Sequence, residues 1–209
     1  MTVGPDQVAK VLRGYAADAV NLIPAYETVS SERVFAPIMD WLPQLPATVL
    51  DLGAGTGRDA AWLCQQGYRI WAVEPVRVFR EAGKALHGKH AINWVDDRLP
   101  ELARVSAMSQ RFDLIVANAV LHHLTAADQV AAISMASGLL ESKGRMICAL
   151  RHGPTPASRP GYPVLTQDLM AAAQMRGLRL CYQRTNLESH QTGNRRAGVS
   201  WDWLMFVRE

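Results

Sequence analysis

A short apolar run ends at Asp51 and is followed by three glycines at alternate positions, Gly53, Gly55 and Gly57. Such a run predicts a buried strand entering a tight turn, where residues without a Cβ atom let backbone N–H groups approach a ligand. Glu74 follows about twenty residues later, a spacing typical of the acidic residue that binds ribose in nucleotide-binding βαβ units. The segment therefore predicts a βαβ unit with a site for an adenosine-containing ligand.

The glycine spacing differs from the G-x-G-x-x-G fingerprint of dinucleotide-binding folds. Arg58 stands where the third fingerprint glycine would be, and about forty-five residues precede the strand that carries the glycines. A minimal dinucleotide-binding fold begins with that strand. Both differences weigh against a nicotinamide cofactor, which remains only a distant alternative.

Strand and helix patterns alternate from residue 48 to residue 150. Apolar runs predict strands near 48–52, 69–74, 91–95, 112–117 and 144–150. Apolar residues at helical spacing predict helices near 57–66, 76–86, 100–107 and 126–140. This alternation indicates the α/β class, with a mostly parallel sheet covered by helices on both faces.

Helical patterns precede the first strand. Apolar residues at helical spacing predict a helix over 5–23 that Pro24 ends, and a second helix from Ser31, as its N-cap, to Trp41. With 209 residues, of which 49% are apolar, the chain can form one domain with a sizeable core.

The pattern changes after the fifth strand. Four prolines between His152 and Pro163 predict a rigid loop, which a helix near 166–176 follows. Two last strands, near 178–185 and 199–208, have the layout of an antiparallel hairpin. Trp201 and Trp203 alternate along the last strand and should lie on one face.

Three further motifs follow the glycine turn in order. They are residues 69–75 with Glu74, residues 91–100 with Asp96 and Asp97, and residues 112–124 with Asn118, His122 and His123. Together with Asp51 to Gly57, the series resembles the class I S-adenosylmethionine-dependent methyltransferases, whose first motif is an apolar strand ending in acidic-x-G-x-G-x-G. The resemblance covers residues 47 to 152. Residues 57–60, 150–154 and 198–201 look like an uncharacterised proteobacterial branch with a small-molecule type of acceptor.

The resemblance implies a Rossmann-like class I methyltransferase fold with a mostly parallel seven-stranded sheet and an antiparallel C-terminal strand. It also implies one methyltransferase domain over residues 1–209. The parts are an N-terminal helical cover (1–45), a core that binds S-adenosylmethionine (46–152), and an acceptor-side loop with the C-terminal hairpin (153–209).

The resemblance further implies S-adenosylmethionine as cofactor and S-adenosylhomocysteine as product. Glu74 would accept hydrogen bonds from both ribose hydroxyls, and Asp96 or Asp97 would face the adenine amino group. Tyr15 and Tyr26 resemble the tyrosines of a lid over the cofactor, although core packing is nearly as good an interpretation of Tyr15. The expected cofactor-binding residues are Asp51, Gly53, Ala54, Gly55, Gly57, Arg58, Glu74, Pro75, Asp96, Asp97, Asn118, Tyr15 and Tyr26.

Three residues are candidates for catalysis. His122 and His123 follow the strand that lies under the sulfonium in the family, and histidine is the natural general base near neutral pH. His123 matches the family position better than His122. The alternative is that one histidine packs beside the methionine part of the cofactor, while the other caps the following helix or faces solvent. Arg151 closes the fifth strand, where it would hold a carboxylate or phosphate of the acceptor or else bond loop carbonyls.

Missing motifs constrain the acceptor. Asn118 is followed by Ala-Val-Leu, not by the Pro-Pro-aromatic signature of enzymes that methylate amides and adenine amines, and no Pro-Cys pair supplies a nucleophile for cytosine. A small metabolite, with an anionic group as one option, is therefore the leading acceptor, methylated at O, N or S. Methylation of RNA or protein is the alternative, and a regulatory module that binds the cofactor without turnover is another.

Composition limits the remaining partners. The formal net charge is +3, and the arginines near the C-terminus are too sparse for a nucleic-acid stripe. Three separated cysteines give no zinc or disulfide pattern, so no metal is expected. No signal peptide or membrane-length apolar run is visible, which predicts a cytoplasmic protein. We expect it to be a monomer or a homodimer.

Overall fold

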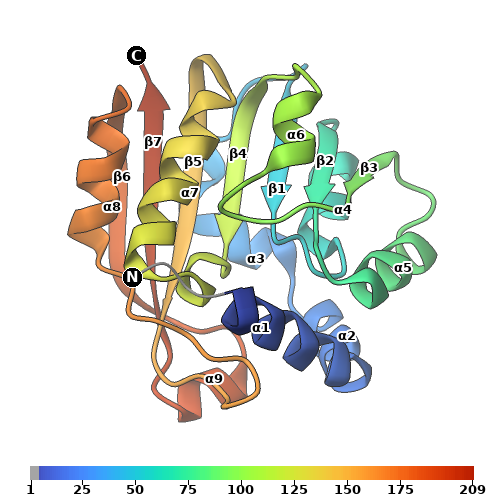
Figure 1. Ribbon diagram of the computed structural model, residues 1–209. Helices are drawn as coiled ribbons and strands as arrows, with labels where there is room; N and C mark the ends of the chain where they lie inside the picture. Colours follow the sequence, from blue (N-terminus) through green and yellow to red (C-terminus); the bar gives the residue numbers. More distant parts are fainter. Residues whose placement is uncertain (1–4) are drawn as a thin grey trace.

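The computed structural model describes residues 5–209 and is built around one seven-stranded sheet (Figure 1). The first four residues of the predicted cover lie outside the described part. The strand order is β3-β2-β1-β4-β5-β7-β6. The strands are β1 (Thr48–Leu52), β2 (Arg69–Val73), β3 (Ile92–Val95), β4 (Phe112–Asn118), β5 (Leu140–His152), β6 (Leu178–Glu188) and β7 (Ser200–Arg208).

Strand directions confirm the predicted topology. β1, β2, β3, β4 and β5 pair in parallel, whereas β7 pairs antiparallel with both β5 and β6. β5 begins at Leu140, four residues before the predicted start, because Leu140 already pairs with Phe112 of β4. The carboxyl ends of the five parallel strands therefore meet at one edge of the sheet, where ligands bind in open α/β folds.

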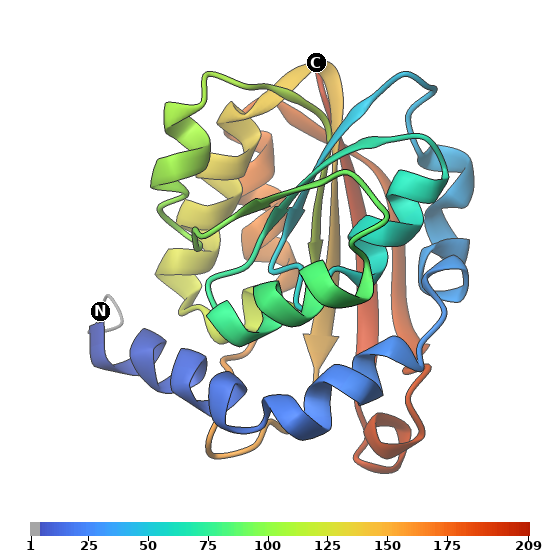
Figure 2. The same ribbon diagram turned by 90° about the vertical axis from the view of Figure 1, so that its right-hand side faces the viewer.

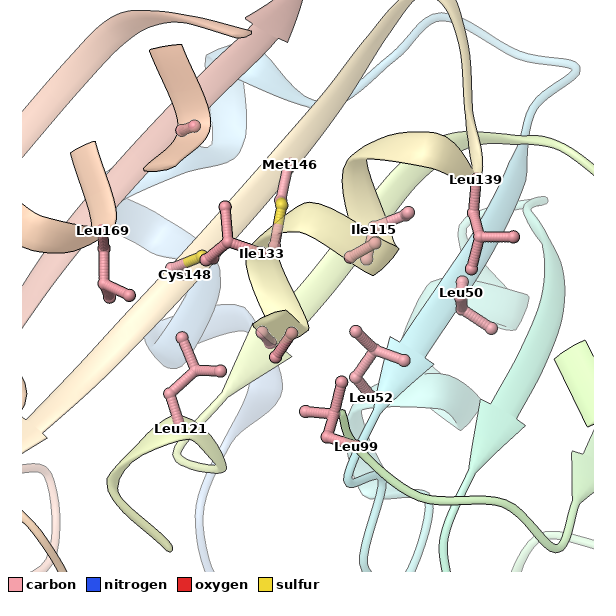
Figure 3. Packing of buried hydrophobic residues seen from close by; sticks show 14 of the residues in the cluster. Leu50, Leu52, Leu99, Ile115, Leu121, Ile133, Leu139, Met146, Cys148 and Leu169 are labelled. Carbon is pink, nitrogen blue, oxygen red and sulfur yellow. The ribbon is translucent and has the colours of Figure 1, made fainter. Parts of the chain in front are cut away.

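Helices cover both faces of the sheet, as predicted. α6 (Ala103–Ala107), α7 (Ala126–Gly138) and α8 (Thr166–Gln174) cover one face, while α3 (Ser31–Phe35), the 3-10 helix η1 (Ala36–Trp41) and α4 (Arg58–Gln65) cover the other. Figure 3 shows Ile133 of α7 beside Met146 and Cys148 of β5, and Leu52 of β1 near Leu99, within the first core cluster. The second cluster joins Phe35 to Trp203, and Trp201 packs against it, so the two tryptophans share a face.

Two helices form a cover at the carboxyl edge of the parallel strands. α1 (Pro5–Ala17) and α2 (Ala19–Glu27) run across this edge and contact α5 (Arg77–Leu86), as Figures 1 and 2 show. The prediction that one helix ends at Pro24 is wrong: the helices divide at Asp18, and α2 continues through Pro24 to Glu27. Pro24 lies on an exposed side of α2, so water can satisfy the carbonyl that loses its helical N–H partner.

The second predicted helix is shorter than expected and changes type. Ser30, not Ser31, caps α3, because its side chain accepts a hydrogen bond from the Arg33 N–H. The chain continues as η1, with Pro37 in its first turn, and ends at Trp41 as predicted. Ser31 is buried, and its hydroxyl faces α4.

The proline-rich loop after β5 packs against the cover. Gly14 of α1 lies so close to the loop that a Cβ atom there would be 2.0 Å from the Ser158 carbonyl oxygen. The Arg159 guanidinium lies 2.5 Å from an Asp18 carboxylate oxygen. A short helix that the sequence did not indicate, α9 (Thr192–Arg196), lies between β6 and β7 at the same edge (Figure 1). Within residues 5–209, no helix has the length and apolar character to span a membrane.

Candidate active site

A cavity of about 890 Å³ opens at the carboxyl edge of the parallel strands. The turns after β1, β2 and β4 form one end of it, and the ends of β5, β6 and β7 form the other. α1, α2 and the loop after β5 contribute the cover. Its volume is in the range typical of small-molecule sites.

The glycine turn after β1 has the predicted backbone conformation. Gly53, Gly55 and Gly57 have φ angles of +73°, +56° and +75°, which other residues rarely adopt. A Cβ atom at Gly53 would lie 2.8 Å from Val120, and one at Gly57 would lie 2.6 Å from Trp94. Gly57 does not line the cavity, so packing explains that glycine, whereas Gly53 and Gly55 lie at the cavity wall.

Glu74 connects the glycine turn to the end of β2. Its carboxylate accepts hydrogen bonds from the Gly55 N–H (2.9 Å) and the Val76 N–H (2.8 Å), and it lines the cavity. Burial raises the pKa of the Glu74 carboxyl to about 7, although the two N–H donors act in the opposite direction. A carboxylate has about four lone-pair sites, so Glu74 can still accept hydrogen bonds from a ligand.

Asp51 lies at the base of the turn and not in the cavity lining. The side chain is buried, and its Oδ2 atom has no hydrogen-bond partner among the described residues. Burial raises the pKa of the Asp51 carboxyl to about 8, with nearby Asp59 adding to the increase. Asp51 is therefore set beneath the turn and does not reach the cavity surface.

Arg58 and Asn118 are both bound to Asp59. The Asp59 carboxylate accepts hydrogen bonds from Arg58 Nε and Nη2 (2.8 Å each), Asn118 Nδ2 (3.0 Å) and the Ser31 hydroxyl (2.7 Å). Arg58 also donates to the Tyr26 carbonyl. Sequence reasoning treated Asp59 only as a favourable charge at a helix start, and its role depends on tertiary contacts with α3 and β4.

Neither Asp96 nor Asp97 lines the cavity, and that one of them faces adenine stays a prediction. Asp97 accepts the N–H groups of Arg98, Arg104 and Val105 at the start of α6. Asp96 is paired with Arg80. The neighbouring residues Arg98 and Leu99 line the cavity in their place.

Tyr15 and Tyr26 both line the cavity from the cover. The Tyr26 ring stacks on Phe79 and would contact a Cβ atom at Gly55 at 3.6 Å. The Tyr15 hydroxyl lies 2.6 Å from His123 Nε2. Burial raises the pKa of the Tyr15 hydroxyl well above its ordinary value, so Tyr15 is protonated at neutral pH.

His123 has partners on both ring nitrogens. Its Nδ1 atom lies 3.0 Å from the Pro160 carbonyl, so Nδ1 carries the proton and Nε2 accepts the hydrogen bond from Tyr15. Burial lowers the pKa of His123. The histidine thus joins the cover to the loop after β5 while facing the cavity.

His122 is buried beside His123, with ring centroids 4.0 Å apart. Its Nδ1 atom has no hydrogen-bond partner among the described residues. Burial lowers the pKa of His122 well below its ordinary value, so the ring is neutral at neutral pH. His122 also lines the cavity.

Arg151 lines the cavity at the end of β5 and donates to the carbonyls of Gly153 (3.3 Å) and Pro154 (2.9 Å). The structure thus shows the bonds to loop carbonyls that one interpretation of the sequence gave, and the other, that Arg151 holds an anionic group of the acceptor, stays a prediction. Among the described residues, no group of three or more His, Cys, Asp or Glu side chains is arranged to hold a metal ion.

The cavity fits an adenosine-containing cofactor at the Glu74 end. A buried carboxylate with unused lone pairs suits a ribose diol. Val76, Leu99 and Leu124 line the same end and offer apolar surface to a purine ring. Ala54 and Pro75, which the sequence analysis expects to bind the cofactor, also lie in the cavity wall.

Comparisons with known proteins identify the family of the chain. The sequence profile of a family described as "Methyltransferase domain" matches residues 26–197. An "Uncharacterized methyltransferase" of Geobacillus thermodenitrificans is 28% identical over 118 residues, which is 56% of this chain and 52% of that protein. The chain thus spans about half the length of this curated relative.

Two solved structures show the same fold. The 1,6-didemethyltoxoflavin-N1-methyltransferase of Burkholderia thailandensis, crystallised with 1,6-didemethyltoxoflavin and S-adenosylhomocysteine, has a TM-score of 0.77 and 19% identity, covering 100% of this chain and 91% of that one. A TehB-like S-adenosylmethionine-dependent methyltransferase of Corynebacterium glutamicum has a TM-score of 0.65 and 22% identity, covering 95% and 98%. The chain belongs to the methyltransferase domain family, and its fold is the class I fold of S-adenosylmethionine-dependent enzymes. The predictions of family and fold are confirmed.

Proposed function

We propose that this chain transfers a methyl group from S-adenosylmethionine to a small molecule that binds in the same cavity. The observation that supports this most directly is the continuity of the cavity from Glu74 to His123 and on to Arg151. One end has a carboxylate that can accept hydrogen bonds from ribose hydroxyls, and the other has side chains that can take up a proton and contact the methyl acceptor. The Burkholderia thailandensis neighbour was crystallised with a small molecule and S-adenosylhomocysteine together.

The cofactor would be held at the Glu74 end. Glu74 would bind the ribose hydroxyls, Val76 and Leu99 would contact the purine, and Ala54 and Asn118 would lie beside the rest of the molecule. When bound, S-adenosylmethionine supplies a methyl group on a positively charged sulfur, which makes that carbon electrophilic. The chain itself must hold the acceptor in line and exclude water.

Tyr15 and His123 would receive the proton of the acceptor. The acceptor proton passes to the Tyr15 oxygen while the Tyr15 proton moves to His123 Nε2, 2.6 Å away. The imidazolium that results keeps its Nδ1–H on the Pro160 carbonyl. His123 is neutral before the step because burial lowers its pKa, so Nε2 is free to take the proton.

A fractionated cell extract of the source organism tests the proposed acceptor class. The purified chain is incubated with methyl-labelled S-adenosylmethionine and, separately, with the small-molecule, RNA and protein fractions. We expect label to enter the small-molecule fraction only, with stoichiometric S-adenosylhomocysteine. Label in RNA or protein would contradict the proposal, and so would tight cofactor binding without product from any fraction.

The same assay tests the proton path. Tyr15→Phe and His123→Gln should each slow transfer by about a hundredfold or more, the range of general base catalysis, with little change in S-adenosylhomocysteine affinity. Tyr162→Phe, a tyrosine outside the cavity lining, is the matched control. Unchanged transfer in both variants would remove Tyr15 and His123 from the mechanism.

A further inference from the structure

The cavity extends beyond the residues assigned to the cofactor and to proton transfer. Its far compartment is lined by Arg33, Arg151, Arg184, His190, Trp201 and Trp203. None of these side chains is needed to bind an adenosine at the Glu74 end. The chemistry of this compartment therefore bears on the acceptor.

Strand register places two arginines beside two indoles on one face of the sheet. Arg151 of β5 pairs with Trp201 of β7, and Trp203 pairs with Arg184 of β6. Directly paired residues of neighbouring strands lie on the same face, with Cβ atoms roughly 5 Å apart. Trp201 and Trp203 also share that face, and both belong with the core cluster beneath α3. Each of the two indoles that line the compartment therefore has an arginine as its cross-strand neighbour.

The arginines of the compartment lack carboxylate partners. Ion pairs among the described residues involve other arginines, and none includes Arg33, Arg151 or Arg184. Glu188 is the acidic residue of this part of the lining, and Asp59 is already bound by Arg58, Asn118 and Ser31. Arg151 is half-buried and bonded only to neutral carbonyls, so a second, anionic partner would stabilise its charge.

A second cavity adjoins the far compartment. This cavity, of about 460 Å³, shares Val29, Arg33, His190, Gln191 and Asn194 with the main one. The two cavities therefore lie next to each other between the α2–α3 connection and α9. The shared wall includes Arg33 and His190, which adds cationic and hydrogen-bonding side chains to the compartment.

We infer that the far compartment binds the acceptor as a planar aromatic anion, with its ring against the indoles and its carboxylate or phosphate on Arg151 and Arg184. This inference rests on the proposed function in one respect, that the bound ligand is the molecule that receives the methyl group. The binding chemistry itself follows from the compartment. Arginine suits both parts of such a ligand because its planar group binds oxyanions bidentately and stacks on aromatic rings.

Three probe molecules test separately the need for a negative charge and the need for an aromatic ring in the ligand. 2-Naphthoate, 2-naphthamide and cyclohexanecarboxylate are titrated by calorimetry into the S-adenosylhomocysteine-loaded protein and into the ligand-free protein. We expect 2-naphthoate to bind roughly tenfold or more tightly than either of the others, since one lacks the charge and the other lacks the ring. Equal binding of the acid and the amide, or no binding of the acid to either form, would overturn the inference.

Substitutions test whether Arg151 and Arg184 cause the preference for 2-naphthoate over 2-naphthamide. Arg151→Gln and Arg184→Gln should each bring 2-naphthoate to within about threefold of 2-naphthamide without changing S-adenosylhomocysteine affinity. Arg179→Gln is the control, because Arg179 lies on the same strand but pairs with Glu209. An equal loss in the control would contradict the assignment. If naphthoate binds as expected and S-adenosylhomocysteine does not, the proposed function fails while the anion site stands.

Discussion

Protonation of Glu74 should make the affinity for the cofactor depend on pH. The ribose hydroxyls of a ligand donate to the ionised carboxylate, so binding favours deprotonation of a group whose pKa is about 7 when the protein is ligand-free. Below that value the carboxyl must lose a proton first, which costs about 1.4 kcal/mol per pH unit. S-adenosylhomocysteine affinity should therefore fall up to tenfold per unit as the pH is lowered from about 8 to about 6.

Calorimetry across this pH range checks the prediction. Glu74→Gln should bind more weakly at the upper end and show a flat profile, because the amide does not titrate. Glu81→Gln, an exposed glutamate that pairs with Arg77 outside the cavity lining, should keep the wild-type profile. A wild-type affinity that is independent of pH would contradict the role of Glu74.

Single residues were predicted unevenly from the sequence. Glu74 and Gly55 were identified because their spacing follows the βαβ unit itself. Asp97 has the same chemistry as Glu74, but its carboxylate accepts two N–H groups of α6 and that of Arg98, and no local pattern distinguishes a capping aspartate from one that faces a ligand. The hydrogen bond between Tyr15 and His123 was not predicted, because the two residues are far apart in the sequence and only the fold brings them together.

At the scale of elements, Asp59 holds three of them together. It joins α4 to Ser31 of α3 and to Asn118 of β4 from a buried position. Asp59→Ala would leave these donors and Arg58 without their carboxylate. We expect the free energy of unfolding to fall by about 3 kcal/mol or more, the usual result of removing one member of a buried pair.

Urea unfolding measures this loss. Asp40→Ala is the matched control, since Asp40 is exposed at η1 and such changes alter stability by about 0.5 kcal/mol or less. A loss below about 1 kcal/mol for Asp59→Ala would show that the four hydrogen bonds contribute little.

The contact of α1 with the loop after β5 is set by a glycine. A methyl group at Gly14 would lie 2.0 Å from the Ser158 carbonyl oxygen, so Gly14→Ala must push the helix and the loop apart. We expect a loss of about 1 to 3 kcal/mol and faster amide exchange in residues 153–165. Gly138→Ala at the end of α7, where a methyl group meets nothing within 4 Å, should not destabilise the chain. Equal behaviour of the two variants would exclude tight packing at Gly14.

Elements were predicted well where a periodic pattern continues over many residues. All seven strands and the α-helices between β1 and β6 were found, because their apolar residues repeat along a buried face. The α1–α2 boundary, the change from α3 to η1 and the short helix α9 were missed. These features are decided by packing at the carboxyl edge of the sheet, which local sequence does not encode.

The whole molecule should lose stability as the pH rises from about 6.5 to about 8. In the folded state burial holds the pKa of Glu74 at about 7 and that of Asp51 at about 8, whereas both groups ionise near pH 4 when unfolded. The folded state therefore binds more protons than the unfolded state in this range, and stability falls by up to about 1.4 kcal/mol per unit for each group. His122 and His123, whose pKa values are lowered, act in the opposite sense only below about pH 6.5.

Urea unfolding at several pH values checks whether stability falls as the pH rises. The variants are Asp51→Asn and, as the control, Asp40→Asn. Asp51→Asn should reduce the slope of stability against pH, and Asp40→Asn should not. Stability that rises through this range, or an unchanged slope for Asp51→Asn, would contradict the assignment of buried protonated carboxyls.

At the same scale, the sequence predicted the sheet and the family but not the form of the acceptor end. Motifs along the chain identify the cofactor end, because each follows its own strand. The compartment of Arg151, Arg184 and Trp201 depends on the pairing of β5, β7 and β6, and only the folded register brings these residues together.

The central claim is that the cavity at the glycine turn binds S-adenosylmethionine, and titration calorimetry tests it most directly. We predict one site for S-adenosylmethionine and S-adenosylhomocysteine, no comparable binding of NADH, and an affinity about 1 to 3 kcal/mol weaker in Glu74→Ala through lost hydrogen bonds. Absence of binding for both adenosine ligands, or an unchanged affinity in Glu74→Ala, would contradict the claim.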